Sequence, residues 1–310
     1  MSELAAQVID RDRGLGTAYE RYHFYRLVER WAAEYGVKTA LEGPLDGMAG
    51  VSGVHLAGLA RRGVQVTSAL PNEPKAALAR AVYRTAGGGV AADVRVVADP
   101  MRAAEELAPA DLVIAYHALP LAPAWRAYLR LLAGLARKVL VVTVCNPDNW
   151  GVAAIRAVAR LRGLGAREID APETWRCEIL APELWGVGRV REHTYFDAPW
   201  WPDLQVAPGQ SLRDRARQLL RQPAGELRFT AAGKGARLAE RFVYGPGRWP
   251  YFGDDGWSDE LEPALRRHPS FERASAAVAR RAAHLHAFVV DRRPRTPQAR
   301  RRLAVVGTTA

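Results

Sequence analysis

A glycine-rich segment contains the first residues that could hold a ligand. It reads Glu42-Gly43-Pro44-Leu45-Asp46-Gly47-Met48-Ala49-Gly50-Val51-Ser52-Gly53. Four glycines let a backbone approach a ligand closely and leave amide groups free at the start of a following helix. Such turns also serve as plain connections between a strand and a helix. The segment predicts a ligand-binding loop, and a plain connection is the alternative.

His117 is the candidate proton acceptor. It follows the apolar run 111–116 and precedes Leu119-Pro120. An imidazole at the end of a buried strand could take a proton from a nucleophile near neutral pH. The other interpretation is that it only contacts a cofactor or caps the turn. We expect His117 to be catalytic.

Aromatic residues gather in two segments outside the regular pattern, 195–203 and 249–257. Trp200, Trp201 and Trp249 are the candidates to wall an apolar pocket for a substrate. The alternative is that they pack an irregular insertion against the rest of the domain.

Nothing in the spacing of possible ligands predicts a metal. His284 and His286 share one face of a strand, but no third ligand follows at a spacing typical of metal sites. The acidic run 254–262 is typical of a solvated loop. Cys145 and Cys177 are too few for a disulfide framework or a zinc site of their own. We therefore expect no metal.

The net charge of +11 raises the possibility of a nucleic-acid partner. Only four of the 44 basic residues are lysine, a bias that suggests GC-rich coding rather than a binding surface. The densest basic cluster, residues 292–302, is typical of a solvated tail. We expect a small-molecule partner and no nucleic acid.

Strands and helices alternate in the first half of the chain. An aromatic amphipathic helix is expected over 18–35, strands over 37–42, 64–70, 94–98, 111–116 and 138–145, and helices over 54–62, 75–85 and 125–136. Five strands alternating with helices require a mostly parallel, doubly wound α/β sheet with right-handed crossovers.

The domain organisation follows from where this order stops and returns. We expect a helical lid over 1–36, a cofactor-binding core over 37–180, an insertion on the substrate side over 181–270, and a last helix, last strand and basic tail over 271–310. No apolar run reaches the ~20 residues of a membrane span, and no signal-like start precedes the fold. A cytoplasmic location is the expectation.

At this point the chain resembles the class I S-adenosylmethionine-dependent methyltransferases, over roughly residues 19–150 and again near 284–290. The resemblance lies in the aromatic helix, in Thr39-Ala40-Leu41-Glu42-Gly43 as first motif, in Asp99 after the third strand, and in the run 111–119. It implies a Rossmann-like, seven-stranded sheet whose last strand is antiparallel, and S-adenosylmethionine as cofactor.

The resemblance also implies residue roles. Glu42 would stand near the methionine amino group, and Gly43, Asp46 and Gly47 would line the cofactor loop. Pro71 takes the place where the family has an acid for the ribose hydroxyls, so Asn72 and Glu73 behind it are the candidates.

Further along, Asp99 would reach the adenine amine and Tyr116 would contact the cofactor, with Tyr22 of the lid on the substrate side. The predicted function is methyl transfer to a small or medium-sized, partly apolar acceptor. Two alternatives stay open: a nicotinamide-dependent oxidoreductase, although Gly-x-Gly-x-x-Gly is missing, and a methyltransferase-like domain that binds without catalysis.

Overall fold

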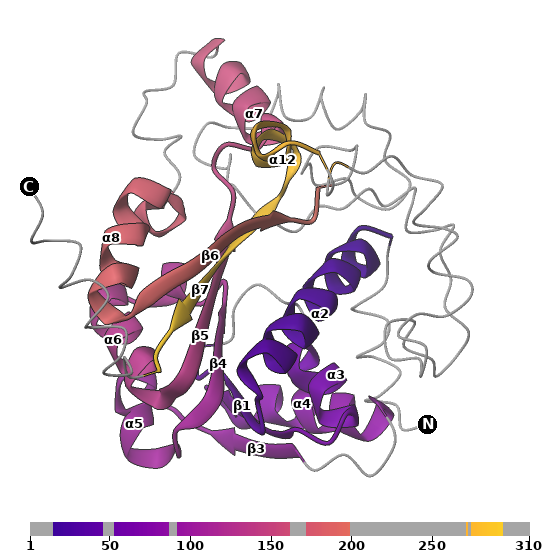
Figure 1. Cartoon of the computed structure of the whole chain (residues 1–310), viewed down its shortest axis with the longest axis vertical. Coiled ribbons are helices and arrows are strands. Elements are labelled where there is room, and N and C mark those ends of the chain that lie inside the picture. The colour runs from indigo at the N-terminus through magenta and orange to yellow at the C-terminus, as the bar shows by residue number, and fades with distance from the viewer. Residues whose placement is uncertain are drawn as a thin grey trace, which may run out of the picture.

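The computed structural model describes residues 15–45, 53–86, 92–161, 172–198, 271 and 274–293. Their strands are β1 (Thr39–Glu42), β2 (Gln65–Leu70), β3 (Ala92–Val96), β4 (Ala110–Tyr116), β5 (Ala136–Cys145), β6 (Arg189–Phe196) and β7 (Leu285–Asp291). They form one sheet in the order β3-β2-β1-β4-β5-β7-β6 (Figure 1). Strands β1 to β5 are parallel to one another, and β7 is antiparallel to both β5 and β6. The predicted seven-stranded, mostly parallel sheet with an antiparallel last strand is confirmed.

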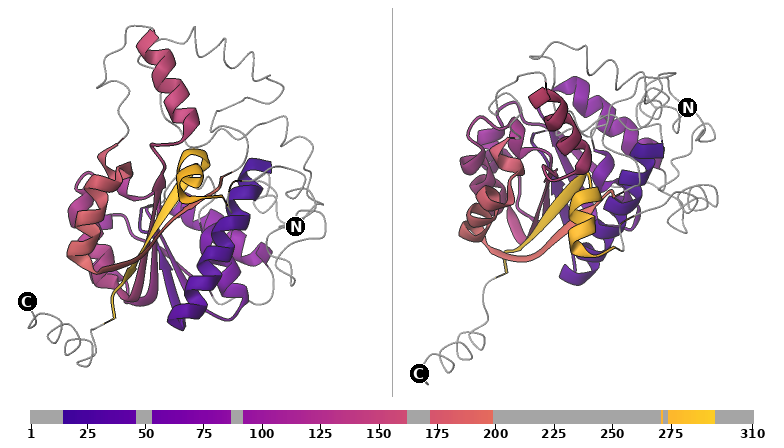
Figure 2. Two further views of the ribbon diagram at one scale, coloured as in Figure 1. Left: turned by 45° about the horizontal axis from the view of Figure 1, so that its top comes forward. Right: turned by 90° about the horizontal axis from the view of Figure 1, so that it is seen from above.

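Helices cover both faces of this sheet. On one face lie α2 (Leu15–Tyr35), α3 (Val54–Arg61) and α4 (Glu73–Ala86), and on the other α5 (Ala103–Glu106), α6 (Trp125–Leu135) and α8 (Cys177–Val187) (Figures 1 and 2). α7 (Trp150–Leu161) extends away from the sheet, and α12 (Ala276–Ala282) precedes β7. None of the described helices is long and apolar enough to cross a bilayer.

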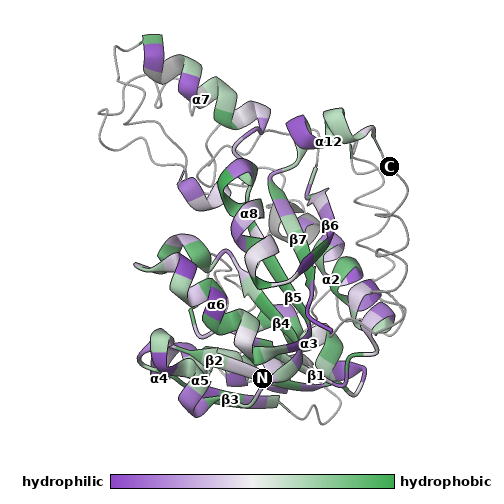
Figure 3. Cartoon of the chain, turned by 60° about the vertical axis from the view of Figure 1, so that its left-hand side comes forward, coloured by the Kyte–Doolittle hydropathy of each residue, from purple (hydrophilic) through white to green (hydrophobic). Residues whose placement is uncertain are grey.

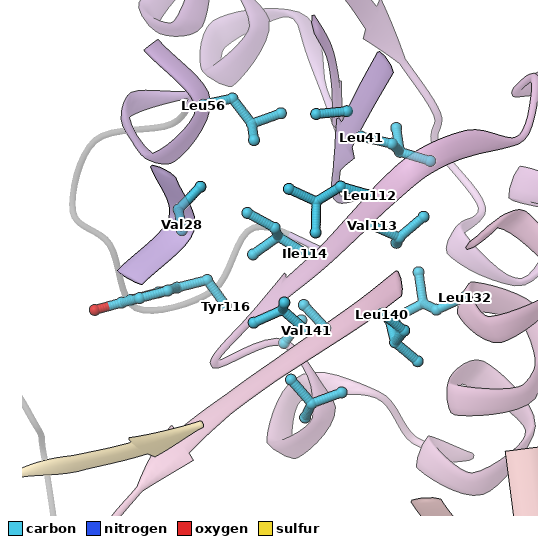
Figure 4. Close-up of a cluster of buried hydrophobic side chains, with 14 of the residues drawn as sticks. Val28, Leu41, Leu56, Leu112, Val113, Ile114, Tyr116, Leu132, Leu140 and Val141 are labelled. Carbon is cyan, nitrogen blue, oxygen red and sulfur yellow. The ribbon is translucent and has the colours of Figure 1, made fainter. Parts of the chain in front are cut away.

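The core lies on both sides of the central strands. All seven residues of β4 are buried, as the continuous apolar run predicts for a strand covered on both faces. In Figure 4, Leu112, Val113 and Ile114 of β4 lie among Val28, Leu56 and Leu132 from helices on the two faces. Figure 3 shows the same arrangement, with hydrophobic central strands between helices that carry hydrophilic outer surfaces. Each such side chain stabilises the fold by about 1.5–3 kcal/mol.

The last part of the sheet corrects one expected boundary. Residues 181–196 were expected to belong to an insertion, yet α8 packs on the sheet and β6 pairs with β7 along its length. β6 is an edge strand with alternating exposed and half-buried residues, and its charged side chains obscure the strand pattern in the sequence. The rest of the expected insertion, 199–270, and the basic tail from 294 lie outside the described residues.

This topology brings several polar side chains to one edge. The carboxyl ends of β1, β4 and β5 meet there, and β6 runs in the same direction as β5 because both are antiparallel to β7. Glu42, Tyr116 and Asp197 therefore lie near the edge where open α/β sheets bind their ligands, and α2 packs against it.

Candidate functional site

Five side chains form a largely buried polar network at this edge, which we call the edge network: Glu20, Arg21, Glu42, His55 and Tyr116. Arg21 lies at the centre, with Nη1 at 2.9 Å from His55 Nε2 and 3.0 Å from Glu20 Oε1. His55 Nδ1 is hydrogen-bonded to Glu42, and the Tyr116 hydroxyl donates to Glu20. The network thereby joins α2 and α3 to the ends of β1 and β4.

The donors of the network determine the tautomer of His55. A guanidinium has donors only, so His55 Nε2 must accept from Arg21. The proton of a neutral imidazole then lies on Nδ1, which donates to Glu42 Oε1. His55 thus links the guanidinium of Arg21 to the carboxyl group of Glu42.

Glu42 has one oxygen to spare. Its Oε2 is buried and has no hydrogen-bond partner among the described residues. A buried carboxylate oxygen without a partner is costly, because the water it gave up is not replaced. The end of β1 therefore offers an acceptor suited to a cationic or N–H group of a ligand.

Aromatic rings enclose the network. The rings of His55 and Tyr116 stack at 3.8 Å between centroids, and Phe24 meets both edge-on. Burial raises the pKa of Tyr116 well above its usual value, and the negative charge of Glu20 adds to this shift. Tyr116 therefore remains a hydroxyl donor, and in Figure 4 its oxygen points out of the aliphatic cluster.

His117 has an unusual backbone conformation. Its φ is 50°, in the left-handed region that few non-glycine residues adopt, and only 2% of its surface is exposed. Its amide donates to the Thr143 carbonyl at 3.0 Å, and its Nδ1 lies 3.6 Å from Cys145 Sγ. Strain of this kind at a strand end is typical of functional positions.

Three predicted cofactor residues take part in local structure at the ends of β2 and β3. Asn72 Oδ1 accepts from the Lys75 amide at 3.1 Å and so caps the start of α4. Glu73 forms an exposed ion pair with Arg80, which lies two turns further along α4. Asp99 accepts from the Met101 amide at 2.9 Å. Their expected contacts with the ribose and the adenine stay predictions.

Gly43 is a glycine for a reason that involves no ligand. Its φ is 109°, and a Cβ there would lie 2.1 Å from the carbonyl oxygen of Ala69 in β2. The resemblance places Gly43 in the cofactor loop, and this role stays a prediction. The neighbouring strand by itself already excludes a side chain at this position.

The other predicted residues divide into two groups. Tyr22 lies on α2, is 8% exposed, and its hydroxyl accepts a hydrogen bond from Arg26. The remaining ones, Asp46, Gly47, Trp200, Trp201 and Trp249, lie outside the described residues.

Sequence reasoning missed the buried ion-pairing residues. Glu20 and Arg21 lie in an amphipathic helix, where charged residues normally face solvent, and His55 lies in an apolar helical stretch. A further buried pair, Asp197 with His284 at 3.1 Å, joins the end of β6 to the start of β7. His193 was missed in the same way. His286 and Cys177 were weighed as metal ligands and rejected for want of a third ligand, because residues 177, 193 and 286 meet only in the folded chain.

The strand order and the antiparallel seventh strand define the fold of the class I S-adenosylmethionine-dependent methyltransferases, which is the fold of this chain. The edge network lies at the edge where that fold takes its ligand.

Comparison with solved structures finds proteins of similar architecture at low identity. The plantazolicin methyltransferase BamL, solved with a desmethyl-plantazolicin analogue and SAH, is 10% identical with a TM-score of 0.46, covering 94% of this chain and 90% of that one. Magnesium protoporphyrin IX methyltransferase from Synechocystis PCC 6803, with bound SAH, is 17% identical with a TM-score of 0.42 over 56% of this chain and 75% of that one.

The [4+2]-cyclase SpnF is also similar, at 16% identity and a TM-score of 0.41 over 87% of this chain and 82% of that one. No protein-family model matches the chain, and no curated protein matches its sequence. The fold assignment depends on the sheet itself and not on these scores.

Proposed function

We propose that this chain transfers a methyl group from S-adenosylmethionine to a small or medium-sized, partly apolar acceptor. The observation that supports this proposal is the buried, unpartnered Oε2 of Glu42 at the carboxyl end of β1. In a sheet of this strand order, the end of β1 is where a nucleotide-like cofactor is held.

The residues at this edge fit the amino-acid end of the cofactor. An ammonium group supplies the donor that Glu42 Oε2 lacks, and the charge of Arg21 is already balanced by Glu20. Asn72, Glu73 and Asp99 are the acceptors nearest to the ends of β2 and β3, for the ribose and the adenine. When bound, the cofactor supplies a methyl group on a sulfonium centre.

His117 would act on the acceptor. Methyl transfer depends on alignment of the acceptor with the methyl group and on exclusion of water. Where the acceptor's nucleophilic atom carries a proton, a base on the protein must remove it. The imidazole of His117 is buried at the end of β4, next to Tyr116 of the edge network, with ring centroids 4.7 Å apart. Its role is to accept that proton as the methyl group transfers.

Calorimetric titration with S-adenosylhomocysteine and with NAD tests the proposal. We expect the first to bind and the second not to bind. Glu42→Gln should weaken S-adenosylhomocysteine binding by about 1.5–3 kcal/mol, roughly 10- to 150-fold, the range for a hydrogen bond to a charged group. Glu34→Gln, an exposed carboxylate on the same helix as Arg21, is the matched control and should bind as the wild type does.

Other outcomes would contradict the proposal in different ways. Binding of NAD alone would favour the oxidoreductase. Binding of neither would leave a methyltransferase-like domain without the cofactor. Equal affinity of the Glu42→Gln and Glu34→Gln proteins would remove Glu42 from the cofactor site.

A further inference from the structure

A second group of reactive side chains lies on the sheet face that α8 covers. Cys177 is the first residue of α8, His193 lies in β6 and His286 lies in β7. One ligand atom from each of them lies within 4.8 Å of the other two. We call this group the Cys–His cluster.

The three ligand atoms converge on one point. His193 Nε2 and His286 Nδ1 are 2.9 Å apart, and Cys177 Sγ lies 3.8 Å from the first and 3.6 Å from the second. These are the corners of a small triangle of two nitrogens and one sulfur, contributed by three different elements.

The triangle has nearly the size of one face of a tetrahedral zinc site. With Zn–N near 2.0–2.1 Å and Zn–S near 2.3 Å, tetrahedral angles place N and N about 3.3 Å apart, and S and N about 3.5 Å apart. The two S–N distances here, 3.6 and 3.8 Å, match within a few tenths of an ångström, and the N–N distance of 2.9 Å needs to open by a similar amount.

Neighbouring rings hold the two imidazoles in place. The ring of His193 lies flat on Phe288, with centroids 4.2 Å apart and an interplanar angle of 2°. The ring of Tyr195 stacks on His286 at 5.7 Å. Ligands whose orientation is fixed by packing lose little freedom on binding a metal.

We propose that Cys177, His193 and His286 bind one Zn²⁺ ion, with a fourth position open to water. One thiolate and two imidazoles form a donor set that zinc accepts, and three protein ligands leave one coordination place. His286 is buried whereas His193 is exposed, so the ion can enter from the side of β6. The bound ion would tie the start of α8 to the last two strands of the sheet.

The proposal is independent of methyl transfer and is tested on the tag-free full chain, freed of metals with a chelator. Titration with Zn²⁺ in competition with a chromophoric chelator should show that each chain binds one Zn²⁺ ion tightly. Co²⁺ in place of Zn²⁺ should give the thiolate-to-cobalt charge-transfer band and the strong visible bands of a four-coordinate ion. Cys177→Ser should abolish the charge-transfer band, and both Cys177→Ser and His193→Gln should weaken Zn²⁺ binding at least about tenfold.

The chain offers matched controls for each ligand type. Cys145→Ser removes the other thiol and His23→Gln removes a histidine of α2, and both should bind Zn²⁺ as the wild type does. Circular dichroism checks that the variants fold, and His193→Gln, at an exposed position, keeps the test valid if Cys177→Ser does not fold. Absence of a tight equivalent in the wild type, or equal affinities of the ligand and control variants, would overturn the proposal.

Discussion

Gly43 provides a sharp test of why the loop after β1 contains glycine. An alanine Cβ at this position would lie 2.1 Å from the Ala69 carbonyl oxygen, 3.0 Å from its carbon and 3.2 Å from the Ala69 Cβ. The atom in the way belongs to the backbone of β2, which pairs with β1 and cannot rotate aside as a side chain does. Gly43→Ala must therefore move the end of one strand.

The magnitude follows from two separate costs. A side chain at a φ of 109° adds about 1–3 kcal/mol of backbone strain. Forcing an extra methyl group into close-packed structure adds about 1–3 kcal/mol. We expect Gly43→Ala to lower the free energy of unfolding by about 2–6 kcal/mol, a large part of the about 5–15 kcal/mol that domains have.

Urea unfolding of three variants separates the two costs. Gly63 has a φ of 83° with nothing within 4 Å of an added Cβ, so Gly63→Ala should lose only the strain, about 1–3 kcal/mol. Gly134 in α6 is equally open without a positive φ, so Gly134→Ala should gain about 0.5–1 kcal/mol. If Gly43→Ala lost no more stability than Gly63→Ala, contact with β2 would not explain why this residue is glycine.

Three further predictions concern the α2 face and His117. Burial lowers the pKa of His23 to about 4 in the folded protein, whereas in the unfolded chain this histidine has a pKa of ~6.5. Between pH ~6.5 and about 4 the unfolded state therefore binds a proton at His23 that the folded state does not bind. The free energy of unfolding should fall in this range by up to about 1.4 kcal/mol for each pH unit. In urea unfolding, His23→Gln should lack this contribution, so its free energy of unfolding should depend less steeply on pH. Phe24→Ala should cost about 3–5 kcal/mol in urea unfolding because Phe24 is fully buried, whereas Leu161→Ala, at 86% exposure, should change it by less than about 0.5 kcal/mol. Asparagine tolerates the left-handed conformation of residue 117, so His117→Asn should fold and retain its affinity for S-adenosylhomocysteine. Turnover of an acceptor found by screening should fall about 10²- to 10⁴-fold. Unchanged turnover would show that His117 has a structural role only.

The central sheet was predictable because its signal is local. The runs 111–116 and 138–145 are apolar without interruption, and a strand covered on both faces requires this composition. β6 was missed for the opposite reason. Arg189, Arg191 and His193 are exposed, and an edge strand tolerates charged and polar residues because solvent reaches it.

The candidate site was predictable only in part, for a physical reason. Glu42 and His117 could be placed from their positions at strand ends, since the edge where parallel strands end is fixed by topology. The residues that hold Glu42 come from two helices, and no spacing in the sequence places Arg21 beside His55, 34 positions away. The Cys–His cluster likewise joins residues from 177 to 286, which pair only once β6 and β7 align.

β7 separates the edge network from the Cys–His cluster. Leu285 pairs with Phe196, whose ring stacks on Phe24 of α2, so this side of the strand faces the edge network. The next residue, His286, points to the opposite face, where Cys177 of α8 meets it. A metal ion at the Cys–His cluster would therefore touch no side chain of the edge network. His117 lies within electrostatic range of His286, so the charge of the ion would reach His117 through space as well as through the register of β5 and β7.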